Sequence, residues 1–255
     1  MNVLIRGGGD LASGVAVRLH RTGMNVVISE LEQPLAVRRT VSFSEAVYNG
    51  ECIVEGIRAR KAISPEEISD FLGEGVIPVL IAPELDSVKF DYSIIVDSRL
   101  IKTPVNYPLN DNKLIIGLGP GFSAGVNCHA VVETNRGHML GRVYWEGSAQ
   151  ADTARPEGDP RRVLRSPADG NISVLKDIGQ HVEANQPVAE VAGQKVFSPF
   201  SGVIRGMIHP GLPVHKGMKI GDVDPRDDPA FCRLVSDKAL AVAGGVLEAI
   251  LTPRR

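Results

Sequence analysis

The chain has 255 residues, enough for one large domain or two to three small ones, with no recognisable signal peptide and no apolar run long enough for a membrane span. Its 28 lysines and arginines against 30 aspartates and glutamates give a formal net charge of −2, which argues against general attraction to nucleic acid or an anionic membrane. Three widely spaced cysteines make neither a disulfide framework nor a metal clip, so we expect reduced thiols in a cytoplasmic protein.

The first 30 residues predict a strand, a glycine turn, a helix and a second strand. Residues 3–5 are apolar and run into three glycines at 7–9. Apolar residues then recur at helical spacing up to Gly23, and a second apolar run ends at Glu30. A unit of this kind predicts a right-handed parallel crossover.

The alternation of strands and helices continues beyond this unit. Ser64-Pro65-Glu66-Glu67 has the N-cap, first-turn proline and glutamate of a helix start, and Pro78 marks its strand as an edge or irregular strand. Five or six apolar strands with intervening helices predict a mostly parallel α/β sheet, and we expect a Rossmann-like domain over residues 1–155. Further strands are expected at residues 52–56, 76–81, 93–97 and 114–117.

The second part of the chain contains an internal repeat. Residues 150–162, QADTARPEGDPRR, predict a linker. Beyond it, SPADG at 166–170 returns as SPFSG at 198–202, an offset of 32 residues. Two copies of one short β unit predict a small pseudo-symmetric β domain over residues 162–225. A helical tail is expected over 226–255, where adjacent glycines predict close packing against another element.

The first glycine turn is the main candidate binding site. Gly7-x-Gly9-x-x-Ala12 matches the relaxed dinucleotide-binding pattern, and Glu30 follows Gly9 by 21 residues, the spacing at which a carboxylate holds a ribose hydroxyl. The helix start offers free N–H groups to a phosphate, whereas the Asp10 carboxylate would repel it unless it caps the helix. The alternative is a glycine turn that only packs.

A second glycine cluster follows the strand at 114–116. Because loops at the carboxyl ends of neighbouring parallel strands converge, Gly119 and Gly121 are expected to share one anion site with the first turn; the alternative is a tight turn. Thr134 and Arg136 follow the next strand, and Arg136 could fork onto a phosphate. We expect no metal site and identify no catalytic residue.

Several long stretches resemble the YqeB-like accessory proteins of selenium-dependent molybdenum hydroxylases. They include VLIRGGGDLASGVAVRLHRTG, IGLGPGFSAG, AVVETNRGHMLGRVYWEG and SDKALAVAGGVLEAIL, and the resemblance spans nearly the whole chain. The first part is also similar to the Rossmann-type domain of xanthine dehydrogenase accessory factors. The resemblance implies a cytoplasmic maturation protein that handles a molybdopterin-type cofactor and meets a client molybdenum hydroxylase.

Residues 162–225 resemble the biotinyl- and lipoyl-type barrel-sandwich hybrids. Carrier members of that family hold their prosthetic group on a Met-Lys dipeptide, whereas Gln194 precedes Lys195 here. We therefore expect neither biotin nor lipoate, and a docking or lid element instead.

The expected function is thus an accessory protein that binds a phosphate-bearing small molecule, either a molybdopterin-type cofactor or a nucleotide. Two alternatives stay open: an NAD(P)-dependent oxidoreductase or nucleotide-using transferase, and a non-catalytic scaffold. Whether the chain forms a homo-oligomer is also open. The expected cofactor-binding residues are Gly7, Gly8, Gly9, Asp10, Glu30, Gly119, Gly121, Thr134 and Arg136.

Overall fold

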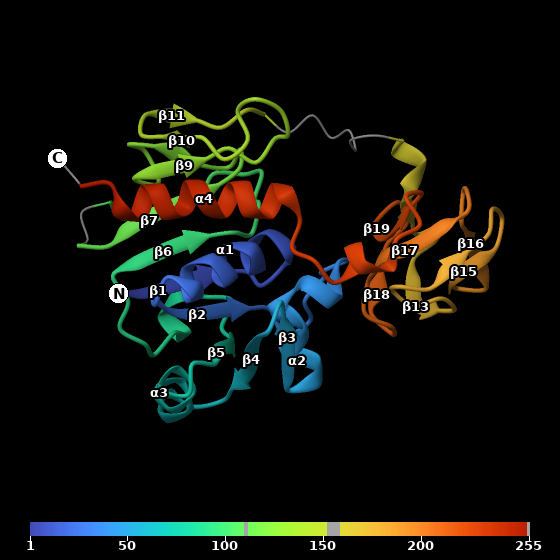
Figure 1. The fold of residues 1–255 in the computed structure, drawn as a ribbon, viewed down its shortest axis with the longest axis horizontal. Coiled ribbons are helices and arrows are strands. Elements are labelled where there is room, and N and C mark those ends of the chain that lie inside the picture. Colours follow the sequence, from blue (N-terminus) through green and yellow to red (C-terminus); the bar gives the residue numbers. More distant parts are fainter. Residues whose placement is uncertain (110–111, 152–158, 254–255) are drawn as a thin grey trace. The chain divides into compact units, whose positions relative to one another are not determined.

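The computed structural model describes residues 1–109, 112–151 and 159–253, so most of the expected linker lies outside the described residues. The chain divides into two compact units (Figure 1). The division differs from the expected domains in two respects: a short segment near residue 38 belongs to the second unit, and the tail helix belongs to the first. The first unit comprises Met1–Pro34, Ser42–Thr153 and Val235–Arg255, and the second comprises Leu35–Val41 and Ala154–Leu234.

The first unit is built on a nine-stranded sheet. Its strands are β1 (Asn2–Arg6), β2 (Asn25–Glu30), β3 (Glu51–Val54), β4 (Ile57–Ala62), β5 (Ile77–Ile81), β6 (Ile94–Asp97), β7 (Leu114–Leu118), β9 (Ala130–Val132) and β10 (Val143–Tyr144). Their order is β10-β9-β7-β6-β1-β2-β5-β4-β3. The strands from β9 to β4 are parallel, whereas β10 and β3 at the two edges run antiparallel to their neighbours. β8 (Ser123–Ala124) and β11 (Gly147–Ser148) form a separate antiparallel pair.

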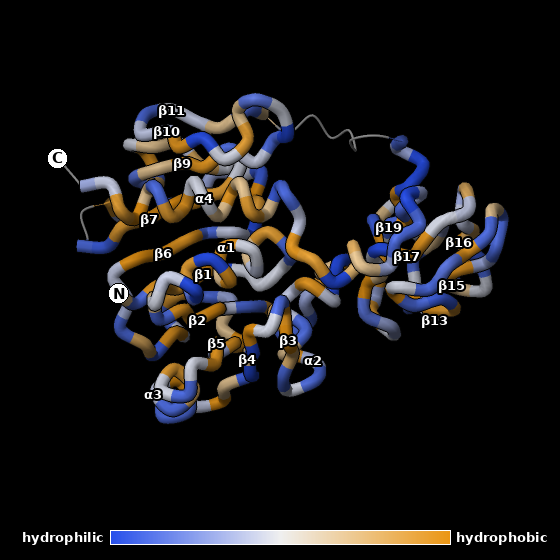
Figure 2. Tube along the Cα trace, in the orientation of Figure 1, coloured by the Kyte–Doolittle hydropathy of each residue, from blue (hydrophilic) through white to orange (hydrophobic). Residues whose placement is uncertain are grey.

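Apolar side chains from neighbouring strands make the core of this unit. Leu4, Val27, Ile95, Ile115 and Val131 come from five strands of the sheet and belong to one buried cluster. Figure 2 shows hydrophobic residues running along β6, β7 and β9. These strands are buried in nearly every residue, which is the pattern of a sheet covered on both faces.

Four helices complete the first unit: α1 (Asp10–Arg21), α2 (Ala46–Asn49), α3 (Pro65–Gly73) and α4 (Asp237–Leu251). α1 and α4 pack closely, because a Cβ atom at Gly14 would lie 2.7 Å from Cβ of Ala239. In α4, a Cβ at Gly245 would lie 2.2 Å from the main-chain oxygen of Gly141, whereas a Cβ at Gly244 would meet no described atom within 4 Å. The predicted close packing of the tail helix is therefore confirmed at Gly245 alone.

The second unit contains two four-stranded antiparallel sheets. Its strands are β12 (Val163–Arg165), β13 (Gly170–Val174), β14 (His181–Val182), β15 (Pro187–Val191), β16 (Gln194–Phe197), β17 (Gly202–Met207), β18 (Pro213–Val214) and β19 (Lys219–Asp224). The sheet orders are β12-β19-β17-β14 and β16-β15-β13-β18. β17, β18 and β19 begin 32 residues after β13, β14 and β15, at 202 against 170, 213 against 181 and 219 against 187, which confirms the internal repeat.

Residues 35–41 are held in the second unit by arginine side chains. Arg39 donates from Nε to the main-chain oxygen of Met207 at 2.8 Å and from Nη2 to Asp177 at 2.8 Å. Arg38 donates from Nη2 to the main-chain oxygen of Phe231 at 3.0 Å. A segment from the first quarter of the sequence is therefore an integral part of this unit.

The predicted fold class, a Rossmann-like parallel sheet followed by a biotinyl- or lipoyl-like barrel-sandwich hybrid, is wrong. The large sheet is mixed, the second unit has two antiparallel sheets and takes in residues 35–41, and the C-terminal helix packs in the first unit. One cause is a missed hairpin: Glu55 and Gly56, expected inside a strand, have φ angles of 46° and 82° and turn the chain from β3 back into β4. Pro78 also lies in β5, which has β2 and β4 on its two sides and is not an edge strand.

Candidate functional site

Most of the expected binding residues lie at the carboxyl ends of the parallel strands. β1 runs into the glycines at 7–9, β2 ends at Glu30, β7 runs into Gly119, and Thr134 follows β9 closely. In the sheet order, only β6 separates β7 from β1. The structure therefore places both glycine turns on one edge of the sheet, where connections of this type form their ligand crevices.

A buried ionic network lies where the direction of the sheet connections reverses, between β1 and β6. Arg6 ends β1 and is in register with Asp97, which ends β6. The Tyr107 hydroxyl donates to Oδ2 of Asp97 at 2.7 Å and accepts from Nη1 of Arg6 at 2.8 Å. Arg99 donates from Nη2 to the same carboxylate oxygen at 2.6 Å. Two guanidinium groups share one carboxylate, so the network carries a net positive charge.

The charges in this network are firmly held. Asp97 is fully buried and Arg6 is 5% exposed. Burial, followed by the charge of Asp97, raises the pKa of Tyr107 well above its usual value. The hydrogen bond to Asp97 raises the pKa of Arg99. The protonated form of Tyr107 is therefore favoured, and two guanidinium groups on one carboxylate make the network a positive region.

The first glycine turn is partly occupied by groups of the protein itself. The Gly8 amide donates to Oε2 of Glu30 at 2.7 Å, and the Leu31 amide donates to Oε1 at 2.7 Å. On the other side, the Ser44 amide donates to the main-chain oxygen of Gly8 at 2.9 Å. Burial raises the pKa of Glu30, against the lowering effect of its two backbone hydrogen bonds. The amide expected to meet a phosphate thus already faces a carboxylate of the chain.

The segment after β6 fills the space between the two glycine turns. Gly119 has a φ of 85° and its amide donates to the main-chain oxygen of Val132 at 3.3 Å. Of the three glycines that face the segment at 99–101, only Gly121 must lack a side chain to fit against it, because a Cβ at Gly7 or Gly119 would make ordinary van der Waals contact with that segment. A Cβ at Gly7, Gly119 or Gly121 would lie 3.5 Å from Cγ of Arg99, 3.6 Å from Cδ2 of Leu100 and 2.4 Å from the main-chain oxygen of Ile101, respectively.

Thr134 and Arg136 differ in where they lie. Thr134 is buried, and its Oγ1 would be 3.3 Å from a Cβ at Gly119. Arg136 instead forms a two-point ion pair with Asp237 in the first turn of α4, at 2.6 and 2.8 Å. Its guanidinium is therefore engaged by a carboxylate of the chain and is not directed to a shared anion site with Gly119.

The N-cap of α1 is a glycine. Gly9 has no side chain with which to cap the helix. A Cβ at Gly9 would meet no described atom within 4 Å, and Asp10 lies in the first turn. The hydroxyls of Ser44 and Ser98, which adjoin Gly8 and Gly7, are buried without a hydrogen-bond partner in the described part of the chain. Buried polar groups are usually paired, so these two hydroxyls are unusual.

Most of the polar residues at this edge belong to none of the motifs in the sequence. A charged residue at the end of an apolar strand, as in VLIR and IIVDSR, is the signal that could have found the network of β1 and β6. The same signal marks Glu133 after AVV, which is fully buried and accepts hydrogen bonds from the amides of Thr134, Asn135 and Gln150, each at 2.8 Å. The missed residues are Arg6, Ser44, Asp97, Ser98, Arg99, Tyr107 and Glu133.

Among the residues that the structure describes, no group of three or more histidine, cysteine, aspartate or glutamate side chains could hold a metal ion. No helix among them has the length and apolar character needed to cross a membrane.

Comparison with known proteins gives one relative in sequence. No protein-family model matches the chain. The chain is 43% identical over 256 residues to a protein of Escherichia coli (strain K12) described as "Uncharacterized protein YqeB", a match that covers 98% of the chain and 47% of the relative. The chain therefore spans about half the length of the curated relative it matches. The expected likeness to YqeB is confirmed in sequence, and the relative's name carries no activity.

The solved structures found by comparison are described differently from the sequence relative. They include an aspartoacylase family protein from Mesorhizobium loti (11% identity, TM-score 0.29, covering 87% of this chain and 84% of that one). A succinylglutamate desuccinylase/aspartoacylase from Rhodobacter sphaeroides has 13% identity and a TM-score of 0.28, covering 87% and 85%. Such low scores give no argument for an activity of this chain.

These findings correct the function expected from the sequence. Neither the relative nor the structural neighbours named here are described as accessory proteins of molybdenum hydroxylases; the neighbours are described as aspartoacylase and desuccinylase family proteins. The comparisons therefore give no support to the expected role in molybdenum hydroxylase maturation. The alternatives of an NAD(P)-dependent oxidoreductase, a nucleotide-using transferase or a scaffold find no support in these comparisons either.

Proposed function

We propose that the first unit binds a small phosphate-bearing molecule at the start of α1. The observation that carries this proposal is the pair of buried hydroxyls of Ser44 and Ser98, which adjoin Gly8 and Gly7 and have no hydrogen-bond partner among the described residues. These glycines lead into a 12-residue helix whose N-cap, Gly9, has no side chain. Hydroxyls and helix-start amides are hydrogen-bond donors, and phosphate oxygens are strong acceptors.

The charges around the turn favour one position for the phosphate. The Arg6, Asp97 and Arg99 side chains have a net positive charge, and Arg99 passes beside Gly7. The Glu30 carboxylate accepts from the Gly8 amide and opposes an anion there, and Asp10 adds a second negative charge in the first turn of α1. The phosphate therefore belongs near Gly9 and Arg99, and not at the Gly8 amide that Glu30 occupies.

The proposal concerns binding and includes no reaction. A molybdopterin-type cofactor and a nucleotide, the two ligands expected from the sequence, both carry a phosphate group. A protein partner and self-association, also expected from the sequence, stay predictions.

The test is to place a carboxylate at the helix start. Gly9 has φ −68° and ψ −176°, a conformation open to any residue, so Gly9→Asp should fold. An aspartate N-cap stabilises a helix by roughly a few tenths of a kcal/mol relative to glycine, so the melting temperature should rise slightly. The same carboxylate occupies the helix-start amides and repels an anion, so calorimetric titration with pyrophosphate or ribose 5-phosphate should show binding weakened by about tenfold or more.

Gly9→Ala is the matched control. It adds a Cβ in open space without adding charge, so binding should stay within about twofold of the wild-type protein. Failure of the wild-type protein to bind either ligand would refute the proposal. Equal binding by Gly9→Asp and the wild-type protein, with the melting temperature raised, would refute it as well.

A further inference from the structure

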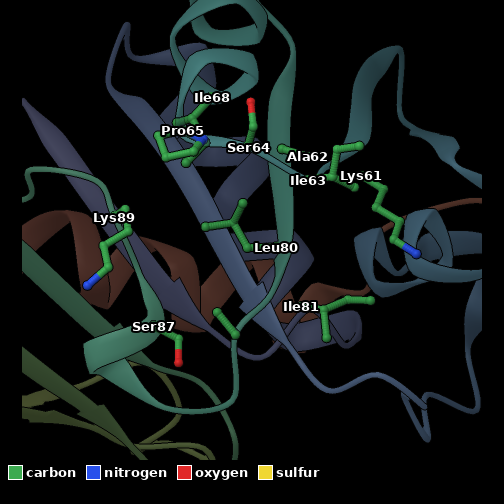
Figure 3. Close-up of a pocket in the computed structure, with 11 residues that line it drawn as sticks. Lys61, Ala62, Ile63, Ser64, Pro65, Ile68, Leu80, Ile81, Ser87 and Lys89 are labelled. Carbon is green, nitrogen blue, oxygen red and sulfur yellow. The ribbon is translucent and has the colours of Figure 1, made fainter.

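A cavity of about 370 Å³ opens at the carboxyl ends of β4 and β5, beside the first turn of α3 (Figure 3). Figure 3 shows the side chains of Pro65, Ile68 and Leu80 grouped together, with Lys61 and Lys89 on opposite sides of them. Small-molecule sites usually measure about 300–1,000 Å³ and are mainly apolar with a few polar groups. The size of this cavity falls within that range, and its lining combines apolar residues with two lysines and two serines.

The cavity adjoins the first glycine turn through β2. Ala82, which lines the cavity, donates its amide to the main-chain oxygen of Glu30 at 3.1 Å. Ile81, also in the lining, is in register with Glu30. The Glu30 carboxylate in turn accepts from the Gly8 amide. In the strand order β1-β2-β5-β4, the start of α1, the carboxylate and the cavity therefore follow one another along one edge of the sheet.

The Glu30 carboxylate can accept more hydrogen bonds than the structure gives it from the backbone. Each oxygen accepts one backbone amide, from Gly8 and from Leu31. An ionised carboxylate has about four acceptor positions in total. The remaining positions suit hydroxyl donors of a ligand, and the side chain is only partly buried.

From this row of three features we infer that the ligand is a nucleotide. The phosphate lies at the start of α1, the sugar hydroxyls donate to Glu30, and the base enters the cavity against Leu80 and Ile68. Lys61 and Lys89 beside the cavity disfavour a cationic group and accept a neutral ring. This inference rests on the proposed phosphate site and names the class of ligand that it takes.

The test compares AMP with ribose 5-phosphate, which differ only in the base. Calorimetric titration of the full chain should show AMP binding about tenfold tighter or more. Ser87 is an exposed residue of the cavity lining, so Ser87→Trp fills the cavity from its surface side. This variant should reduce the preference for AMP to about twofold or less and leave the binding of ribose 5-phosphate unchanged.

Ser69→Trp is the matched control, because Ser69 is exposed on α3 and is not part of the cavity lining. It should bind both ligands as the wild-type protein does. Equal affinity for AMP and ribose 5-phosphate would refute the base site and leave the phosphate site standing. An AMP preference that survives Ser87→Trp would also refute it. If neither ligand binds the wild-type protein, the phosphate site fails and this inference fails with it.

Discussion

The guanidinium of Arg136 makes a two-point ion pair with the carboxylate of Asp237, with N–O distances of 2.6 and 2.8 Å. The pair joins the loop after β9 to the first turn of α4, two segments 101 residues apart in the sequence. A carboxylate in the first turn of a helix also interacts favourably with the helix dipole.

We expect Asp237→Ala to lower the free energy of unfolding by about 1 kcal/mol, because the pair is exposed and surface ion pairs contribute little. Urea denaturation at low salt and at high salt measures the effect, and salt should shrink it. A loss of more than about 3 kcal/mol would contradict this assignment, since losses of that size come from buried groups.

Replacing Ser98 by alanine should affect stability and ligand binding in opposite directions. Ser98→Ala removes a buried hydroxyl that has no hydrogen-bond partner among the described residues, so stability should rise by about 1 kcal/mol. Ligand binding should weaken, because the same hydroxyl is proposed to serve the phosphate. Thermal unfolding and titration with pyrophosphate measure the two effects, and weakened stability together with intact binding would count against the proposed site.

The adjacent glycines of α4 should respond oppositely to alanine. Gly244→Ala should stabilise the protein by about 0.5–1 kcal/mol, because its Cβ enters open space and alanine favours a helix. Gly245→Ala should destabilise it by about 1–3 kcal/mol, because the Cβ collides with the main-chain oxygen of Gly141. Chemical denaturation of the two variants is the measurement, each serving as the other's control.

The Glu133 side chain holds backbone amides of the chain after β9, so its substitution should destabilise the protein. Its carboxylate accepts from three backbone amides while fully buried. Glu133→Gln replaces one acceptor oxygen by an amino group and leaves at least one amide unsatisfied, which costs about 1–3 kcal/mol. The exposed Glu146→Gln is the control and should stay within about 0.5 kcal/mol of the wild-type protein.

His181 should titrate above its ordinary pKa. Its Nδ1 lies 2.7 Å from Oδ1 of Asp227 and its Nε2 lies 3.2 Å from Oε1 of Glu183. The hydrogen bond to Asp227, followed by that to Glu183, raises the pKa above 6.5. The stabilisation is therefore fully present below the unfolded-state pKa and is lost as pH rises through the folded-state pKa. An NMR titration of the imidazole should have its midpoint above 6.5, and Asp227→Asn should lower that midpoint.

Local sequence signals located many elements but not the form of the sheet. The Ser64 N-cap was predictable because its partner, the Glu67 amide, is three residues away. The hairpin at Glu55 and Gly56 was not, because this pair is not among the strong hairpin dipeptides and the apolar residues at 52–54 before it predict one strand that continues through it. The hairpin reverses the chain between β3 and β4. Without it, the sequence did not predict that the sheet has an antiparallel strand, β3, at this edge.

In the candidate site, too, the sequence predicted local features but not contacts between distant segments. The pattern of glycines and Glu30 located the turn, since it depends on a short stretch of chain. The groups that occupy this edge come from distant segments: Tyr107 reaches Arg6 across 101 residues, and Asp237 reaches Arg136 across the same separation. Such pairings depend on the tertiary structure, so the motif alone could not reveal that Arg136 was already engaged.

The pairing of α1 with α4 has a consequence for biosynthesis. The helix near the start of the chain packs on a helix at residues 237–251, so its apolar side stays bare while the intervening residues are being translated. Contacts between such distant segments slow folding, and the waiting surface is a natural target for chaperones on the ribosome. Ribosome-stalled chains that lack α4 should therefore remain protease-sensitive in α1, whereas released chains should not.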